Sequence, residues 1–231
     1  MVNTEDQTLA EEIVQRLSDI GRQTEAAFAS IDWHSVARSV RALEGEVKSL
    51  AAQGWTIPMW ATPSEVVEIL RHTQEGKIDD FFVRYYSTDD ARHLQRLRTE
   101  LSSAKRYTRW IPLLEQSFDG YNQGMYLVVV PSLLTVLDGA VAQAGGPEAW
   151  RSTNVKNVAA KTLQSASSNS ITRVIWASIV AFISNVFQYH DFADDRLAQI
   201  NRHWILHGRD VPDWGQADCL RLFQAIHTIR S

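Results

Sequence analysis

Apolar residues recur every three or four positions along most of the chain. In residues 4–52, for example, this spacing links Ile13, Leu17 and Ile20 and continues to Leu50. A repeat close to 3.6 residues places such side chains on one face of a helix. No stretch combines alternating apolar and polar residues with turn signals at its ends, which is the pattern of a half-buried strand. The pattern therefore predicts an all-α protein.

Helix start and stop signals divide the chain further. Gly, Pro and small polar residues mark the connections, which are predicted at 53–63, 165–170 and 209–215. Helices are predicted at 64–72 with Ser64 as the N-cap, at 78–86, 89–109, 112–144, 147–164 and 172–191, from Asp194 or Asp195 to Gly208, and at 216–230. The helix at 172–191 is apolar on nearly all sides, so we expect it to lie at the centre.

The character of the chain changes near residue 110, where a charged segment gives way to long apolar helices. We therefore expect an N-terminal helical region at 1–110 and a C-terminal helical bundle at 111–231. The hydrophobic fraction of 45% is sufficient for a packed core. Two apolar stretches, 125–144 and 174–187, are predicted to be buried helices. The first is interrupted by Pro131 and an acid, and the second is shorter than the roughly 20 residues that span a bilayer.

Charge and cysteine content narrow the choice of function. A net charge of −4 excludes binding to nucleic acid through bulk positive charge. Residues 196–231 nevertheless carry five Arg against three Asp, which makes this segment locally basic. The single cysteine, Cys219, cannot form an internal disulfide and is expected in the core of a protein from a reducing compartment. The first residues lack the basic and apolar regions of a secretory signal, so we expect a cytoplasmic protein without a membrane segment.

The candidate chemistry lies in residues 201–209, which read Asn-Arg-His-Trp-Ile-Leu-His-Gly-Arg. Positions five apart do not share one face of a helix. Arg202 and His207 therefore converge only if the helix ends near His207, which is the end that Gly208 predicts.

This segment resembles the R-x(4–6)-H signature of HEPN ribonuclease domains. The match consists of Arg202, the polar His203 after it, His207 and the glycine that follows. A second likeness is residues 121–142, which are similar to the first long helix of several bacterial HEPN domains: an apolar run with a proline, then an acid and a glycine. The resemblance covers residues 111–231 and implies a HEPN-like helical bundle with additional N-terminal helices.

The resemblance also implies an activity. A HEPN protein of this type would be a metal-independent endoribonuclease without a cofactor, serving as a toxin or phage-defence effector. An Arg fork matches phosphate oxygens, and a His transfers protons near neutral pH. Attack by the 2′-hydroxyl of RNA needs a base, an acid and positive charge at the phosphate. The implied products are a 2′,3′-cyclic phosphate and a 5′-hydroxyl. The implied partners are RNA, a second copy of the chain in a homodimer, and an antitoxin or regulatory protein.

The resemblance assigns catalysis to Arg202 and His207. Supporting or substrate-binding positions are expected at Asn201, His203, Arg209 and Asp138. His203 would orient the phosphate or neighbouring side chains, and Arg209 would widen the basic patch. Asp138 lies within an apolar helix, where a carboxylate must be paired or hydrogen-bonded. It would either position one of the catalytic residues or cap a neighbouring helix.

Other interpretations of the same residues stay open. Cations near a helix C-terminus often only bind its last carbonyl groups. His203 and His207 have a spacing that can bind zinc, although residue 204 is Trp where the metalloprotease motif has Glu. The basic, aromatic run at 105–110 is either an RNA contact or a solvated helix face. The alternative function is a non-catalytic helical module for dimerisation or partner binding. The chain has no phosphate loop, GxSxG or GxGxxG motif to support other chemistries.

Overall fold

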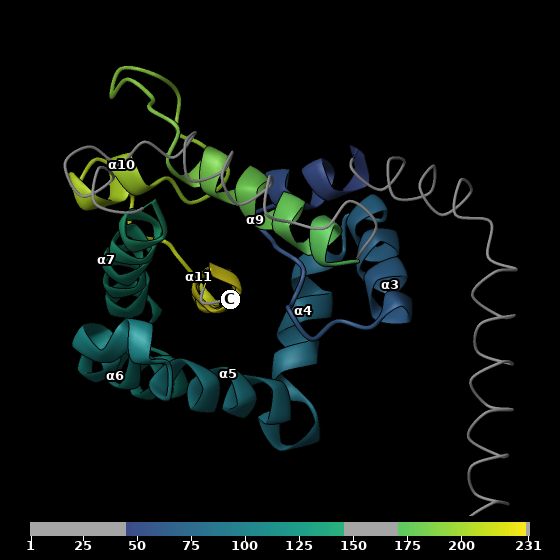
Figure 1. Ribbon diagram of the computed structural model, residues 1–231. Helices are drawn as coiled ribbons and strands as arrows, with labels where there is room; N and C mark the ends of the chain where they lie inside the picture. The colour runs from purple at the N-terminus through teal and green to yellow at the C-terminus, as the bar shows by residue number, and fades with distance from the viewer. Residues whose placement is uncertain (1–44, 146–170, 230–231) are drawn as a thin grey trace, which may run out of the picture. The chain divides into compact units, whose positions relative to one another are not determined.

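The computed structural model describes residues 45–145 and 171–229, which belong to one compact unit extending from Val40 to Ser231 (Figure 1). Every regular element in the described ranges is helical, so the predicted all-α class is confirmed. The predictions made for residues before 45, for the helix at 147–164 and for the connection at 165–170 lie outside the described ranges.

The described elements follow a helical segment at 45–52. They are α3 (Pro63–Gln74), α4 (Ile78–Ser87), the 3₁₀ helix η1 (Asp89–Ala91), α5 (Arg92–Ser102), the 3₁₀ helix η2 (Lys105–Trp110), α6 (Ile111–Asn122), α7 (Tyr126–Gly145), α9 (Ile171–Val186), α10 (Arg202–Leu206) and α11 (Gln216–Ile229).

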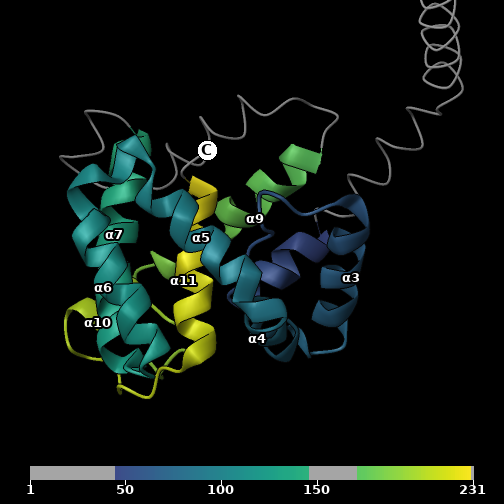
Figure 2. The ribbon, with the colours of Figure 1, turned by 90° about the horizontal axis from the view of Figure 1, so that it is seen from below.

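Helix α11 lies among the other helices and contacts α4, α5, α7 and α9 (Figure 1, Figure 2). Each of its residues from Cys219 to Ile229 is buried. The central helix predicted from the sequence was 172–191, and this prediction was wrong in two respects. Helix α9 ends at Val186, and its residues Ser184 and Asn185 are exposed.

The centre of the molecule was missed because α11 carries polar residues that the neighbouring helices satisfy. Gln224 accepts a hydrogen bond of 2.5 Å from the Tyr86 hydroxyl and donates one of 3.1 Å to Thr56 Oγ1. Nε2 of His227 lies 2.7 Å from Oε2 of Glu100. A buried polar group costs little once it is hydrogen-bonded. The polarity of α11 therefore did not prevent its burial.

One hydrophobic core includes residues on both sides of position 110, from Val47 to Ile229. Hydrogen bonds also cross this position: the Tyr107 hydroxyl donates to the Ile226 carbonyl over 2.8 Å, and the Ile57 amide donates to Ser178 Oγ over 2.9 Å. The boundary predicted at residue 110 therefore does not separate two cores in the described residues. In the basic, aromatic run of 105–110, the one buried side chain is that of Tyr107.

Several helix ends differ from the prediction. Thr62, rather than Ser64, is the N-cap of α3, and it forms a capping box with Glu65. The charged helix predicted at 89–109 is confirmed only at Arg92–Ser102, with 3₁₀ turns on either side. The helix predicted from Pro112 to Ala144 is two helices, α6 and α7. A turn at Gly124, whose φ of +74° suits glycine, separates them.

Helix α7 is the one described helix that is long and apolar enough to cross a membrane, judged over an 18-residue window. Half of that window is buried inside the protein, where α7 packs against α6 and α11. Core helices of soluble proteins pass the same test, so this finding does not identify a membrane segment.

Candidate functional site

The candidate site is built around α10, which is much shorter than predicted. The predicted start at Asp194 or Asp195 was wrong: residues 191–201 form turns and bends, and the helix begins at Arg202. The predicted stop is confirmed, since Gly208 has a φ of +65° and follows directly after the C-cap residue His207. Arg202 is therefore the first residue of a helix of about one and a half turns, and His207 is its C-cap.

Asn201 fixes the start of this helix. Its side-chain oxygen accepts a hydrogen bond of 3.1 Å from the Trp204 amide, and its nitrogen donates one of 2.9 Å to the Gln188 carbonyl. Asn201 is only 2% exposed. Of the supporting residues expected from the sequence, Asn201 thus has a position that suits the support of α10 rather than contact with a substrate.

Arg202 points from α10 towards α7, where its Nη2 lies 3.1 Å from Oδ1 of Asp138. Both side chains are about one-third exposed. The guanidinium also lies over the ring of Phe187, at 5.8 Å from the ring centre. Its Nε is buried and has no hydrogen-bond partner among the described residues. The structure therefore pairs Arg202 with Asp138, one of the two roles considered for this acid, and leaves part of the Arg fork unused.

The two histidines of α10 contact each other, with ring centres 4.7 Å apart. His203 is partly buried and His207 is exposed. Desolvation, followed by the charges of His207 and Arg202, lowers the pKa of His203. His203 thus lies close enough to both members of the predicted catalytic pair to interact electrostatically with them. Its lowered pKa favours the neutral imidazole at neutral pH.

Two aromatic residues that precede α10 complete this surface. The ring of Phe192 stacks on that of His203 at 4.6 Å and an interplanar angle of 4°. The ring of Tyr189 lies 5.0 Å from His203 at a tilt of 48°. The guanidinium of Arg209 lies over Phe192, 5.2 Å from the ring centre. We call Tyr189, Phe192, His203 and Arg209 the aromatic patch.

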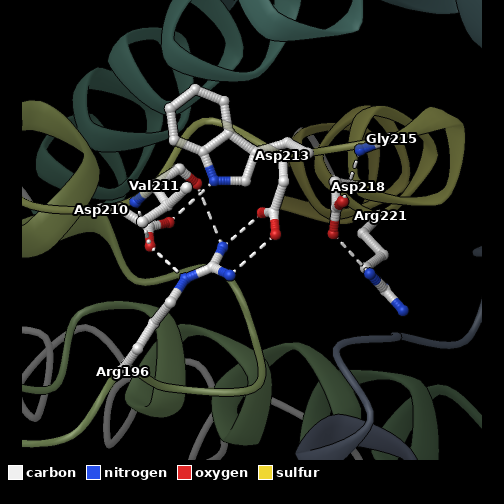
Figure 3. A network of polar contacts seen from close by, with 8 residues as sticks. Arg196, Asp210, Val211, Asp213, Gly215, Asp218 and Arg221 are labelled. Atoms are coloured by element: carbon white, nitrogen blue, oxygen red, sulfur yellow. Dashed lines mark hydrogen bonds and ion pairs between the residues drawn. The ribbon is translucent and has the colours of Figure 1, made fainter.

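The loop that follows α10 is held by Arg196 (Figure 3). The guanidinium donates to Asp210 Oδ1 over 2.7 Å, to Asp213 Oδ2 over 2.8 Å and to the Val211 carbonyl over 3.1 Å. Trp214 Nε1 donates to the second oxygen of Asp210 over 2.8 Å. Because Arg196 is bonded to residues between 210 and 213, its contacts close the segment that carries α10 into a loop.

Five of the six residues predicted for the site form two groups beside α10: Asp138 pairs with Arg202 in one, and in the other His203 contacts His207 and Arg209 shares Phe192 with both histidines. The predicted catalytic pair has different direct neighbours, however. Arg202 contacts α7 and Phe187, whereas the rings near His207 are those of His203 and Phe192.

Sequence reasoning missed Tyr189, Phe192 and Arg196. The first two fell near the predicted end of a buried helix, where aromatic residues are usually packed. A turn composition at 191–195, Asp-Phe-Ala-Asp-Asp, was the signal that this segment leaves the helix.

Metal binding has no further geometric support in the described part of the chain. No group of three or more His, Cys, Asp or Glu side chains gathers there in a way that could hold an ion. His203 and His207 would supply two ligands, fewer than a structural zinc site requires.

Comparisons of the chain with protein-family models, with curated proteins and with solved structures give no significant match.

Proposed function

We propose that the chain is a metal-independent endoribonuclease of the HEPN type that acts as a homodimer. The observation that carries the proposal is that the rings of His203 and His207 contact each other, with centres 4.7 Å apart, on the same short helix that begins at Arg202. A permanent cation and two proton-transfer groups thus lie along one short helix, whose His207 end is exposed. This is the set of groups that cleavage of RNA by its own 2′-hydroxyl requires.

In this reaction Arg202 binds the non-bridging oxygens of the scissile phosphate. A neutral imidazole takes the proton from the 2′-hydroxyl, and the 2′-oxygen forms a bond to phosphorus. The bond from phosphorus to the 5′-oxygen breaks, and that oxygen takes a proton from a protonated imidazole. The products are a 2′,3′-cyclic phosphate and a 5′-hydroxyl. His207 is the exposed candidate for one proton transfer, and a second imidazole must supply the other.

Asp138 has a positioning role in this proposal. Its carboxylate lies 3.1 Å from the Arg202 guanidinium and holds it between α10 and α7. The Arg202 side chain is 32% exposed, so the outer part of its guanidinium is accessible to a phosphate.

The homodimer follows from the different neighbours of Arg202 and His207. A second copy that faces α10 would place its own His207 near the first copy's Arg202 and so complete the acid and base pair. The biological setting proposed with this activity is that of a cytoplasmic toxin or phage-defence effector restrained by an antitoxin or regulatory protein.

A second candidate function is a non-catalytic module for dimerisation or partner binding. The observation that favours it is that Arg202 already has a carboxylate partner, Asp138, within its own chain. In that case α10 would be an interaction surface, and its charges would serve specificity.

Incubation of the full chain with a mixture of single-stranded and hairpin RNAs in EDTA distinguishes the two. The variants are Arg202→Ala and His207→Ala, and the matched control is Arg84→Ala, which removes an exposed Arg on α4, far along the chain from the motif. We expect wild type and the control to release fragments ending in a 2′,3′-cyclic phosphate. The two motif variants should each lose at least about a hundredfold in rate, His207→Ala because a proton-transfer group is removed and Arg202→Ala because the charge at the phosphate is removed.

Intact RNA with folded wild-type protein, at concentrations at which it dimerises, would favour the non-catalytic module. Cleavage that is equal in all four proteins would overturn the assignment of the motif. Circular dichroism and thermal unfolding of each variant exclude loss of folding as the cause.

A further inference from the structure

Tyr189 and Phe192 leave large aromatic surfaces in water beside α10. Tyr189 is 70% exposed and Phe192 is 42% exposed. Apolar surface left in water forgoes about 25 cal/mol per Å² that burial would gain. The eight most exposed large hydrophobic residues of the described chain include both of these rings, and both contact His203. Clustered exposed aromatics next to a candidate active site indicate a binding surface.

The two ends of the aromatic patch differ in charge. Arg209 is exposed, and no carboxylate of the described residues forms an ion pair with it. The acids near Tyr189 bind the backbone of their own segment: Asp194 Oδ2 accepts from the Asp191 amide over 3.0 Å, and Asp191 Oδ1 accepts from the Ala193 amide over 2.9 Å. The Arg209 end therefore offers a cation that suits a phosphate. The Tyr189 end has carboxylates nearby and offers no such cation, so an uncharged ring suits that end.

We propose that the aromatic patch binds an unpaired nucleotide of single-stranded RNA, with its base stacked on Tyr189 and its phosphate bound by Arg209. The inference rests on the proposed ribonuclease function and specifies its substrate as RNA with at least one unpaired base next to the cleaved bond. A base in a duplex is stacked on both faces and cannot lie on Tyr189, so duplex RNA lacks this contact.

Phe192 and His203 position this site. Their rings are nearly parallel and 4.6 Å apart, so Phe192 is packed on a residue of α10. A base on Tyr189 would lie beside His203, because the two ring centres are 5.0 Å apart, and the adjoining phosphate would lie near α10. Tyr189 is in this proposal a specificity-determining residue, not a catalytic one.

Binding is measured by fluorescence anisotropy with a labelled single-stranded oligoribonucleotide and with a blunt RNA duplex of the same length. All proteins carry His207→Ala to prevent cleavage. Base stacking on an aromatic residue contributes about 1–3 kcal/mol, so Tyr189→Ala should weaken binding of the single strand about fivefold to hundredfold. Tyr189→Phe keeps the ring and should retain binding within about twofold. Tyr189→Ala should leave duplex binding unchanged.

Arg209→Ala should reduce the slope of log affinity against log salt by about 0.7 for the single strand, the amount expected for one lost phosphate contact. Equal losses for single strand and duplex, or no loss in Tyr189→Ala, would overturn the stacking assignment. The ribonuclease proposal then still stands if wild type cleaves RNA and Arg202→Ala does not. Absence of both RNA binding and cleavage in wild type would overturn both.

Discussion

His203 and His207 lie one helical turn apart, yet their environments give them different properties. His203 is partly buried against Phe192 and near Arg202, and its pKa is lowered chiefly by desolvation. His207 is exposed. The lowered pKa favours the neutral form of His203, which is the form that can accept a proton at neutral pH.

The lowered pKa of His203 predicts how stability depends on pH. The unfolded chain, with a His pKa near 6.5, binds this proton more readily than the folded chain, so acid favours unfolding. Stability is therefore greatest above pH 6.5 and falls as the pH decreases from 6.5 to the lower folded pKa, below which the loss is constant. Thermal unfolding at pH 7.5 and 5.5 should show a smaller drop in Tm for His203→Gln than for wild type. An equal drop would contradict this.

For single residues, the sequence predicted which charged side chain needs a partner better than it predicted which aromatic side chain is exposed. An acid within an apolar helix must have a partner, and Asp138 has one in Arg202. The exposure of Tyr189 could not be predicted in the same way, because it depends on α9 ending at Val186. The residue type alone does not tell whether an aromatic side chain is packed in a core or exposed on a binding surface.

At the scale of the elements, Gly139 determines how closely α7 approaches the turn before α6. A Cβ built at this position would lie less than 3.0 Å from three atoms of the Trp110 ring, a distance that real Cβ atoms essentially never show. The glycine thus allows an indole to lie directly against the backbone of α7, one residue after Asp138. The same contact helps to fix the position of the acid that pairs with Arg202.

Gly139→Ala should lower the free energy of unfolding by about 1–3 kcal/mol, the usual cost of overpacking. The matched control is Gly45→Ala, another helical glycine, with no atom within 4 Å of the added Cβ. It should leave stability unchanged or raise it by up to about 1 kcal/mol. Urea denaturation measures both. Adding Trp110→Leu to Gly139→Ala should cost less than the sum of the single losses, and a fully additive result would contradict the proposed clash.

Helix type was predictable, whereas helix ends were not. The periodicity of α4 and α11 is strong, and both were predicted within one residue of their observed ends. The break at Gly124 was missed because the apolar pattern continues on both sides of it. α10 was predicted too long, because the start was placed at Asp194 or Asp195, whereas the observed N-cap is Asn201, whose side chain accepts from the Trp204 amide.

At the scale of the whole molecule, the core is organised around α11, which contacts helices from both halves of the described chain. α10 and the segment of residues 187–200 lie at the edge of that arrangement: Ile200 and Ile205 reach the core, whereas Tyr189 and Leu206 are exposed. Binding segments often belong to the less stable parts of a fold. The candidate site thus lies on a peripheral segment, and a ligand could bind there without any movement of the buried helix α11.

Hydrogen exchange of the full chain should report this difference. Amides of α11 should exchange only through global unfolding and be the slowest in the described residues, since every residue from Cys219 to Ile229 is buried. Amides at 189–200 should exchange orders of magnitude faster. Exchange in α11 as fast as in 189–200, measured by mass spectrometry of peptides, would contradict the central position of α11.

The polar residues of α11 also fix its orientation. A buried helix with purely apolar contacts can rotate about its axis at little cost in free energy, because its apolar faces pack against the neighbouring helices in similar ways. Gln224 is bonded to Thr56 and Tyr86, and His227 to Glu100, so rotation would break bonds on two sides at once. Replacing these residues with leucine and methionine would thus preserve burial while permitting several azimuthal settings, and the helix would lose its single register before it lost its compactness.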